Sequence, residues 1–221
     1  MKKEILISIR PKYVTDILNR KKTIEIRKSI PDIIKDWDIK KDETINVYIY
    51  CTKKPKVESQ PDFNGMVVAK FQLIAYEEIE CDPLGGDNEY FTGTLPPGEL
   101  LEHGCLDFAR LNHYLKGKKG FAWYISNLKI FEKPIPLSEF KQPRNSRGKV
   151  DFNTDDFYIQ EVGRAPQSWC YVLPKVTKIY MKNGDVIECV SVSADLNGIT
   201  WFRQADGCSY QLETSKIERI E

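Results

Sequence analysis

A short charged stretch, residues 18–28, holds the side chains of this chain that are best suited to chemistry. Its sequence, L-N-R-K-K-T-I-E-I-R-K, places one carboxylate among lysines and an arginine. Such a carboxylate stays ionised, and the neighbouring cations can hold a phosphate or polarise a carbonyl group. If the stretch is a strand, Ile24 and Ile26 share one face, and Glu25 and Arg27 share the other. The pattern also fits a solvated edge strand whose alternating charges block pairing with another sheet edge, so the residues alone leave both interpretations open.

The residues before this stretch predict how it is positioned. Residues 5–9 have strand character, and this first strand ends at Arg10 and Pro11. Proline at a helix start and apolar residues at helical spacing then predict a short helix over residues 11–18. This β-α-β order brings Arg10, at the end of the first strand, within reach of the charged strand.

The rest of the first part alternates strands with loops. Four further strands are predicted, over residues 46–52, 65–79, 121–131 and 165–172. Residues 100–115 have helical spacing, with Gly104 as a candidate break. We expect loops over residues 81–98 and 141–149, the second of them mobile, and a helical turn within residues 29–38 with Trp37 as a core or lid aromatic.

After residue 174 the pattern changes to short β-rich runs separated by turns. Three dipeptides typical of tight hairpins separate these runs: Asn183-Gly184, Asn197-Gly198 and Asp206-Gly207. About four or five short strands would form a small barrel of SH3-like or Sm-like kind. The sequence therefore predicts two domains, residues 1–173 and 175–221, and we expect the second to be an interaction or self-association module.

Charge is unevenly distributed along the chain, although its net charge is only +1. Residues 1–60 and residues 101–150 each carry a net charge of +6, whereas residues 61–100 carry −7 and residues 151–221 carry −4. Two basic segments that converge would form an anion-binding face. No apolar run approaches the length of a membrane span, and the N-terminal residues do not resemble a signal peptide. We therefore expect a cytoplasmic protein that is not bound to a membrane.

The six cysteines form no CxxC pair and show no regular spacing, so we expect reduced thiols. Cys81, His103 and Cys105 could in principle ligate zinc, but no fourth ligand is evident and the spacing matches no common site. We expect no bound metal and no cofactor.

Several separated blocks of the chain resemble the ASCH domain, a family of the PUA-like superfamily. The family's signature, roughly G-x-K-x-x-E-x-R, is matched by residues 20–27, with Lys22, Glu25 and Arg27 in register. Arg20 stands where the family usually has glycine. The other similar blocks are I-L-I-S-I-R-P-K-Y, V-Y-I-Y-C-T-K-K-P, G-F-A-W-Y-I-S-N-L-K-I-F and P-Q-S-W-C-Y-V, which resemble longer members, many of them encoded by phages.

This resemblance implies an α+β fold, with a PUA-like mixed β-barrel and flanking helices, to which the small all-β C-terminal domain is added. It also implies a cleft beside the signature strand, lined or supported by Lys22, Glu25 and Arg27. Strict alternation would turn Lys22 away from Glu25, so either the strand begins after Lys22 or the lysine reaches around from the turn. Candidate binding residues are cations, hydrogen-bonding groups and stacking aromatics: Arg10, Lys21, Arg27, Trp123, Ser126, Gln167, Ser168 and Trp169. Core packing is the alternative role for both tryptophans.

The resemblance also implies two kinds of function. The first, which we take as the leading hypothesis, is binding of RNA or a modified nucleoside. The second is hydrolysis, because small bacterial members resemble amidohydrolases that remove acetyl from N4-acetylcytidine with Lys, Thr and Glu. Their threonine occupies the position of Glu25, so Lys22, Glu25 and the adjacent Thr23 are the candidate catalytic residues here, for an amidohydrolase or a ribonuclease. A third alternative is a phage-type regulatory protein that binds a protein partner through residues 175–221.

Overall fold

The computed structural model describes residues 3–35, 45–53, 63–81, 90–153, 157–175, 177–189, 191–192, 198–203 and 209–220. Trp37 and the Asp206-Gly207 dipeptide lie outside the described residues. By its contacts the chain divides into two compact units. The first unit comprises Ile5–Glu139 and Gly163–Cys170, and the second unit comprises Met1–Glu4, Phe140–Val162 and Tyr171–Glu221.

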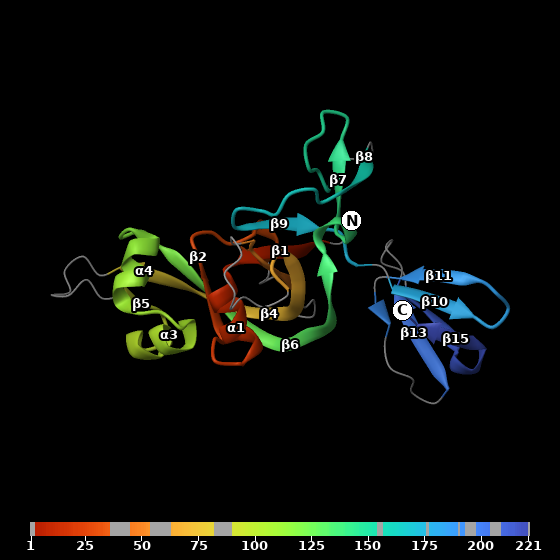
Figure 1. Ribbon diagram of the computed structural model, residues 1–221, viewed down its shortest axis with the longest axis horizontal. Helices are drawn as coiled ribbons and strands as arrows, with labels where there is room; N and C mark the ends of the chain where they lie inside the picture. Colours follow the sequence, from red (N-terminus) through yellow and green to blue (C-terminus); the bar gives the residue numbers. More distant parts are fainter. Residues whose placement is uncertain are drawn as a thin grey trace. The chain divides into compact units, whose positions relative to one another are not determined.

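The first unit combines long strands with short helices (Figure 1). Its elements are β1 (Glu4–Ile9), α1 (Pro11–Leu18), β2 (Ile24–Arg27), α2 (Asp32–Lys35), β3 (Ile45–Cys51), β4 (Met66–Cys81), β5 (Tyr90–Phe91), α3 (Pro97–Gly104), α4 (Phe108–Leu115), β6 (Gly120–Pro136), the short 3-10 helix η2 (Leu137–Glu139) and β9 (Trp169–Val172). The strands predicted from sequence and the helix over residues 11–18 are confirmed, with small shifts at their ends.

Seven strands form one sheet in the order β2-β6-β4-β3-β1-β9, with β5 paired to β4. β1 and β3 run parallel, whereas β3, β4, β6 and β2 pair antiparallel in turn. The predicted α+β fold is confirmed. Within the described residues, however, no backbone pairing joins β2 to β9, so the sheet is not closed into a barrel.

Helices α3 and α4 cover the sheet at β2 and β6. Leu100, Leu111 and Leu115 from these helices pack in one apolar cluster with Ile24 and Ile26 of β2. Figure 1 shows both helices beside β5, at one end of the first unit. The isoleucine face of the signature strand is therefore a core face, as the alternation predicted.

The predicted helix over residues 100–115 is broken where Gly104 suggested. α3 ends at Gly104, Cys105 is left-handed with φ of 51°, and the Asp107 carboxylate caps α4 by accepting from the Arg110 N–H at 2.8 Å. A Cβ added to Gly104 would lie 3.3 Å from the Ile26 side chain, which is a tight contact. Glycine therefore lets the end of α3 approach β2 closely.

The turn from α1 into β2 contains a strained arginine. Arg20 has φ of 59°. Its N–H donates to the carbonyl oxygen of Ile17, and the Lys21 N–H donates to that of Asp16. These two hydrogen bonds are those of a Schellman helix end, where glycine is favoured because a Cβ strains left-handed backbone. An arginine at this position therefore keeps the turn but strains it.

The second unit is built from short strands. Its elements are β7 (Lys141–Asn145), β8 (Phe157–Glu161), β10 (Thr177–Met181), β11 (Val186–Cys189), β12 (Ser191–Val192), β13 (Ile199–Arg203), β14 (Ser209–Glu213), the short 3-10 helix η3 (Thr214–Lys216) and β15 (Ile217–Ile220). Two three-stranded sheets, β11-β10-β15 and β12-β13-β14, contribute to one core of Ile179, Met181, Cys189 and Phe202. The predicted hairpin at Asn183-Gly184 is confirmed, and Gly184 has φ of 92°.

The loop predicted over residues 141–149 is wrong for residues 141–145. Lys141–Asn145 is strand β7, which pairs antiparallel with β8. Gln142 and Pro143 are buried, and Gln142 Nε2 donates to the Tyr171 carbonyl oxygen at 2.6 Å. Pairing and burial thus override a polar composition that contains both Pro and Gly.

Among the described helices of the whole chain, none has the length and apolar character that crossing a membrane would require.

Candidate nucleic-acid interface

The three signature side chains form a buried ion cluster. Lys22, Glu25 and Arg27 are 3%, 7% and 5% exposed. The Glu25 carboxylate lies 3.4 Å from Lys22 Nζ and 3.0 Å from Arg27 Nη2. β2 begins at Ile24, after Lys22, which explains how the lysine reaches the same carboxylate as Arg27. The interpretation of residues 18–28 as a solvated edge strand is therefore wrong.

Lys22 is held at the end of α3. Its ammonium donates to the Gly104 carbonyl oxygen at 2.7 Å and lies 5.4 Å from the ring centroid of Tyr13 in α1. The Thr23 N–H also donates to the carbonyl oxygen of His103. The residues just before the signature strand are thus hydrogen-bonded to α3 through both a side chain and the backbone.

Arg27 links strands that share no backbone pairing with β2. Its Nη2 donates to the Ser8 carbonyl oxygen of β1 at 2.9 Å. Its Nη1 donates to the Ser168 carbonyl oxygen and hydroxyl at 3.2 and 3.3 Å. Close by in sequence, Trp169 Nε1 donates to the Ser29 hydroxyl at 3.1 Å. Side chains therefore join the two ends of the open sheet.

The cluster holds buried donors that the described residues leave without acceptors. Trp123 of β6 faces Glu25 in the strand register and is fully buried. Its Nε1 has no hydrogen-bond partner among the described residues, and the same is true of Arg27 Nε. Since two cations share a single carboxylate, the cluster also carries a surplus of positive charge.

Exposed cations flank the residues of this cluster in sequence. We call the five exposed basic residues of the segment the cationic surface: Arg10, Lys12, Arg20, Lys21 and Lys28. None of them forms an ion pair within the described residues, and Asp16 is the only partly exposed acid between residues 10 and 28. A surface with this charge favours anions.

Two tyrosines flank the cluster from α1 and α4, and no sequence motif marked either of them as a site residue. The Lys12 and Lys28 ammonium groups lie 5.8 and 4.8 Å from the ring centroids of Tyr13 and Tyr114. Burial raises the pKa of Tyr114, with smaller effects of opposite sign from Arg27 and Glu25. Both rings are partly exposed, whereas the ring of Trp123 is not accessible to a stacking base.

The remaining candidates are distributed around the unit. Thr23 is exposed, and its Oγ1 lies 3.1 Å from Nδ1 of His103, a residue that sequence reasoning did not place here. Ser168 and Trp169 lie beside Arg27 and Ser29, as described above, and Gln167 is exposed next to them. Ser126 lies on β6 opposite Gln72 of β4, beyond the end of β2. Ser126 therefore lies outside the part of β6 that pairs with the signature strand.

The described cysteines and histidines do not form a metal site. No group of three or more His, Cys, Asp or Glu side chains is placed to hold a metal ion in the described part of the chain. Burial raises the pKa of the Cys105 thiol, and nearby Asp16 raises it further. Cys105 is therefore a poor thiolate donor at neutral pH.

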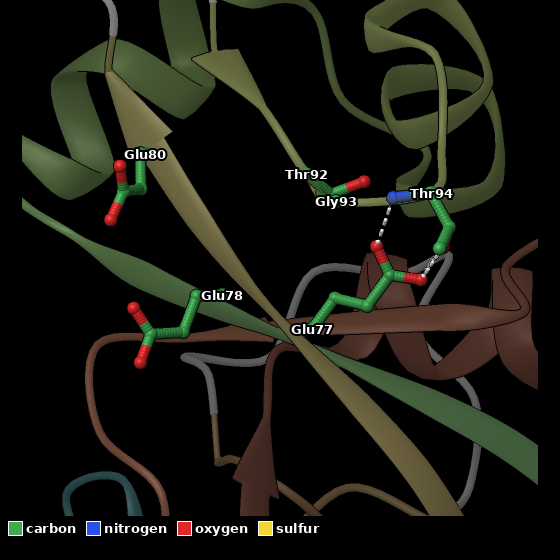
Figure 2. Close-up of a pocket in the computed structure, with 6 residues that line it drawn as sticks. All are labelled: Glu77, Glu78, Glu80, Thr92, Gly93 and Thr94. Atoms are coloured by element: carbon green, nitrogen blue, oxygen red, sulfur yellow. Dashed lines mark hydrogen bonds between the residues drawn. The ribbon is translucent and has the colours of Figure 1, made fainter.

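A cavity of about 350 Å³ lies elsewhere in the first unit, between β4 and the segment after β5. Its lining is acidic and polar: Glu77, Glu78, Glu80, Thr92, Gly93 and Thr94. Figure 2 shows the Glu77 carboxylate turned toward Thr94, with Glu78 and Glu80 on the other side of the strand. Lys119 lies 3.0 Å from Glu78 and 2.5 Å from Glu80.

The Glu77 carboxylate is ionised and accepts several hydrogen bonds in this cavity. The Thr94 N–H donates to its Oε2 at 3.1 Å, and the hydroxyls of Thr94 and Tyr124 donate to Oε1. Burial alone would raise the pKa of Glu77, but these hydrogen bonds outweigh it and lower the pKa to about 2. Burial and, next in size, the hydrogen bond to Glu77 raise the pKa of Tyr124 to about 12. An acidic lining of this kind disfavours phosphate.

A family model described as the ASCH domain matches residues 7–135. The chain is similar to the crystal structure of ASCH from Zymomonas mobilis, with a TM-score of 0.44 and 18% identity over 76% of this chain and 86% of that one. Structures of two mutants of that protein also match, each with a TM-score of 0.42 and 18% identity, over 76% and 77% of this chain and 87% and 90% of theirs. No curated protein sequence matches.

Proposed function

Because the chain belongs to the ASCH domain family, we propose that it binds RNA or a nucleotide through the cationic surface beside its signature strand. Lys22, Glu25 and Arg27 form the rigid support of this surface. The exposed cations make the contacts with the ligand, and phosphate oxygens are their targets.

The observation that carries this proposal is the imbalance of charge between residues 10 and 28. Seven basic residues stand against two acids there, and one of those acids, Glu25, is already paired with two cations. The five cations of the cationic surface have no acidic partner within the described residues. Unpaired cations on ordered elements are suited to phosphates, which dominate the affinity of proteins for nucleic acids.

The buried cluster supports this surface by fixing its backbone. The ion pairs join β2 to the turn at Lys22, and Arg27 joins β2 to β1 and to Ser168. Buried charges that are paired and hydrogen-bonded hold their neighbours in one geometry, whereas the loss of one partner leaves an uncompensated charge. Lys21 and Lys28, at either end of the signature strand, are therefore held at a fixed separation.

The test is a binding assay with a short oligouridylate and charge-matched variants. The double variant Lys21→Ala/Lys28→Ala should bind about tenfold more weakly at 0.1 M salt, because two phosphate contacts are lost. Lys178→Ala/Lys182→Ala is the matched control, since it removes two exposed lysines of the second unit. Equal weakening by both double variants would mean that only net charge matters, and no weakening by the first would contradict the proposal.

Hydrolysis is a second candidate function, favoured by the contact between Thr23 and His103. An exposed hydroxyl 3.1 Å from an imidazole nitrogen is the arrangement of a nucleophile with its general base. It lies directly beside Lys22 in sequence. Under this alternative, incubation with N4-acetylcytidine or a short RNA gives a deacetylated or cleaved product by mass spectrometry.

The variant Thr23→Val separates the two candidates. It removes the hydroxyl at nearly constant volume, so it should abolish any turnover while RNA affinity is retained. Recovery of every substrate unchanged by the wild-type protein would remove hydrolysis from consideration and leave recognition as the function.

A further inference from the structure

Strand β7, which pairs with β8 in the second unit, ends in a turn at residues 145–149 that is ordered by a single side chain. Figure 1 shows the two strands side by side. The Asn145 carboxamide oxygen accepts from the N–H groups of Arg147 and Lys149, both at 3.1 Å. The Asn145 N–H donates to the Lys149 carbonyl oxygen at 2.9 Å, and the Gly148 N–H donates to the Asn145 carbonyl oxygen at 2.8 Å. Gly148 has φ of 72°, which the turn requires.

This ordered turn presents basic side chains. Arg147 and Lys149 are exposed, and their side chains take no part in the hydrogen bonds of the turn. Arg144 is partly exposed, and its Nη1 donates to the Gly148 carbonyl oxygen at 2.7 Å. Its Nε is buried and has no partner among the described residues, so Arg144 contributes charge at the turn while its guanidinium is held in place. We call Arg144, Arg147 and Lys149 the hairpin cations.

An aromatic ring lies beside the hairpin cations. Tyr158 of β8 is the cross-strand partner of Arg144, so the two side chains share one face of the hairpin. Its hydroxyl lies 3.7 Å from the position that a Cβ would occupy at Gly148. Tyr158 is 49% exposed, and this large exposed ring has no role in the core of the unit.

We propose that this hairpin is a second contact site for single-stranded RNA. The hairpin cations bind phosphate oxygens, and an unpaired base stacks on Tyr158. Basic side chains next to an exposed aromatic ring are the combination that single-stranded nucleic acids use, since every base offers a π-face and every nucleotide a phosphate. A duplex keeps its bases paired and cannot use the ring.

The acids of the hairpin all follow its turn in sequence: Asp151, Asp155, Asp156 and Glu161, of which Asp155 and Asp156 lie outside the described residues. Asp151 is occupied within the hairpin, where its Oδ1 accepts from the Asn153 N–H at 2.9 Å and its Oδ2 from Asn145 Nδ2 at 3.5 Å. Glu161 lies opposite Lys141, at the other end of the ladder from the turn. No acidic residue lies between Lys141 and Lys149. The turn, residues 145–149, therefore holds two cations and no acid.

The inference rests on the proposed RNA binding but concerns a different surface, and full-length variants separate the two. Arg147→Ala/Lys149→Ala keeps the backbone of the turn and should weaken binding of oligouridylate about tenfold at 0.1 M salt. It should also lower the slope of log affinity against log salt by about 1.4. The matched control is again Lys178→Ala/Lys182→Ala, which should change neither quantity beyond the effect of net charge.

The aromatic contact is tested with Tyr158→Ala, using oligouridylate and an abasic oligomer of equal length and charge. The variant should lose at least about fivefold in affinity for oligouridylate and nothing for the abasic oligomer. Tyr158→Phe should retain wild-type affinity, and Trp201→Ala, which removes another half-exposed aromatic of the second unit, is the control.

Each outcome has one meaning. Unchanged RNA binding in the hairpin variants, with weakened binding in Lys21→Ala/Lys28→Ala, overturns the hairpin site and leaves the proposed function standing. No binding by the wild-type protein overturns both. If the hairpin variants lose affinity for polyglutamate as much as for oligouridylate, the site is an acidic-protein site, and the assignment to RNA is overturned.

Discussion

Nη1 of Arg27 lies 3.2 Å from the carbonyl oxygen of Ser168, a residue 141 positions further along the chain. Arg27 belongs to β2 and Ser168 directly precedes β9, and these two strands are the ends of the sheet. A guanidinium thus joins the two ends where backbone pairing does not. The arginine of the signature is therefore a structural link in this chain as well as a charge beside the proposed ligand surface.

Replacement of this link should be strongly destabilising. Arg27→Met removes the hydrogen bonds to Ser8 and Ser168 and leaves Glu25 with Lys22 alone. We expect a loss of about 3–5 kcal/mol in the free energy of unfolding, measured by urea denaturation, because a buried pair loses one partner. Arg27→Lys, which keeps the charge but not the forked geometry, should lose less. The exposed Arg164→Met is the control, and equal stability of Arg27→Met and the wild type would contradict the assignment.

Arg20 offers a stabilising change. Glycine relieves the left-handed backbone at φ of 59°, so Arg20→Gly should raise the free energy of unfolding by about 1 kcal/mol. Arg20→Ala removes the same charge but keeps the Cβ, and it should not produce this gain. If alanine stabilises as much as glycine, the effect comes from charge rather than from backbone strain.

Glu77 should make stability depend on acid pH. Its pKa is lowered from 4.5 to about 2 in the folded chain, so the unfolded chain takes up the proton first as pH falls. The stabilisation is fully present above pH 4.5 and is lost as pH falls through about 2. Glu77→Gln should unfold more easily at pH 7, and its stability should change less between pH 5 and pH 2. Parallel urea midpoints for both proteins over this range would refute the role of the carboxylate.

Substitution of Trp169 and of Trp123 should affect different properties, the first RNA affinity and the second stability. Trp169 is partly exposed beside Ser29, so Trp169→Ala should lower affinity for oligouridylate by at least about fivefold, while Trp169→Phe keeps a stacking ring. Trp123 is fully buried, and Trp123→Phe should change the urea midpoint but leave RNA affinity unaltered. A loss of affinity in Trp123→Phe without a change in stability would contradict this division.

Local pattern predicted most of the first unit. The helix α1 lies at residues 11–18, as proline and apolar spacing indicated, and the break at Gly104 was visible as a glycine in a helical pattern. Alternation correctly placed Ile24 and Ile26 in the core. It could not show that Glu25 and Arg27 are buried, because alternating charges look the same on a solvated edge and in an ion cluster. The decisive partners, Gly104 and Ser168, lie 82 and 141 residues away from the groups they bind.

The hairpin of β7 and β8 was missed for a related reason. Residues 141–149 contain proline, glycine and four cations, which is the composition of a loop. Their strand pairing depends on residues 157–161 and on the buried contact between Gln142 and Tyr171. Both are long-range features that a window of sequence does not contain.

The most direct test of RNA recognition is the salt dependence of oligouridylate binding by the wild-type protein. If the cationic surface contacts phosphates, log affinity falls linearly with log salt, with a slope of about −0.7 for each phosphate bound, and thus of about −1.4 or steeper for contacts by Lys21 and Lys28 alone. Affinity that stays constant from low to physiological salt, or no binding at any salt concentration, would contradict the account.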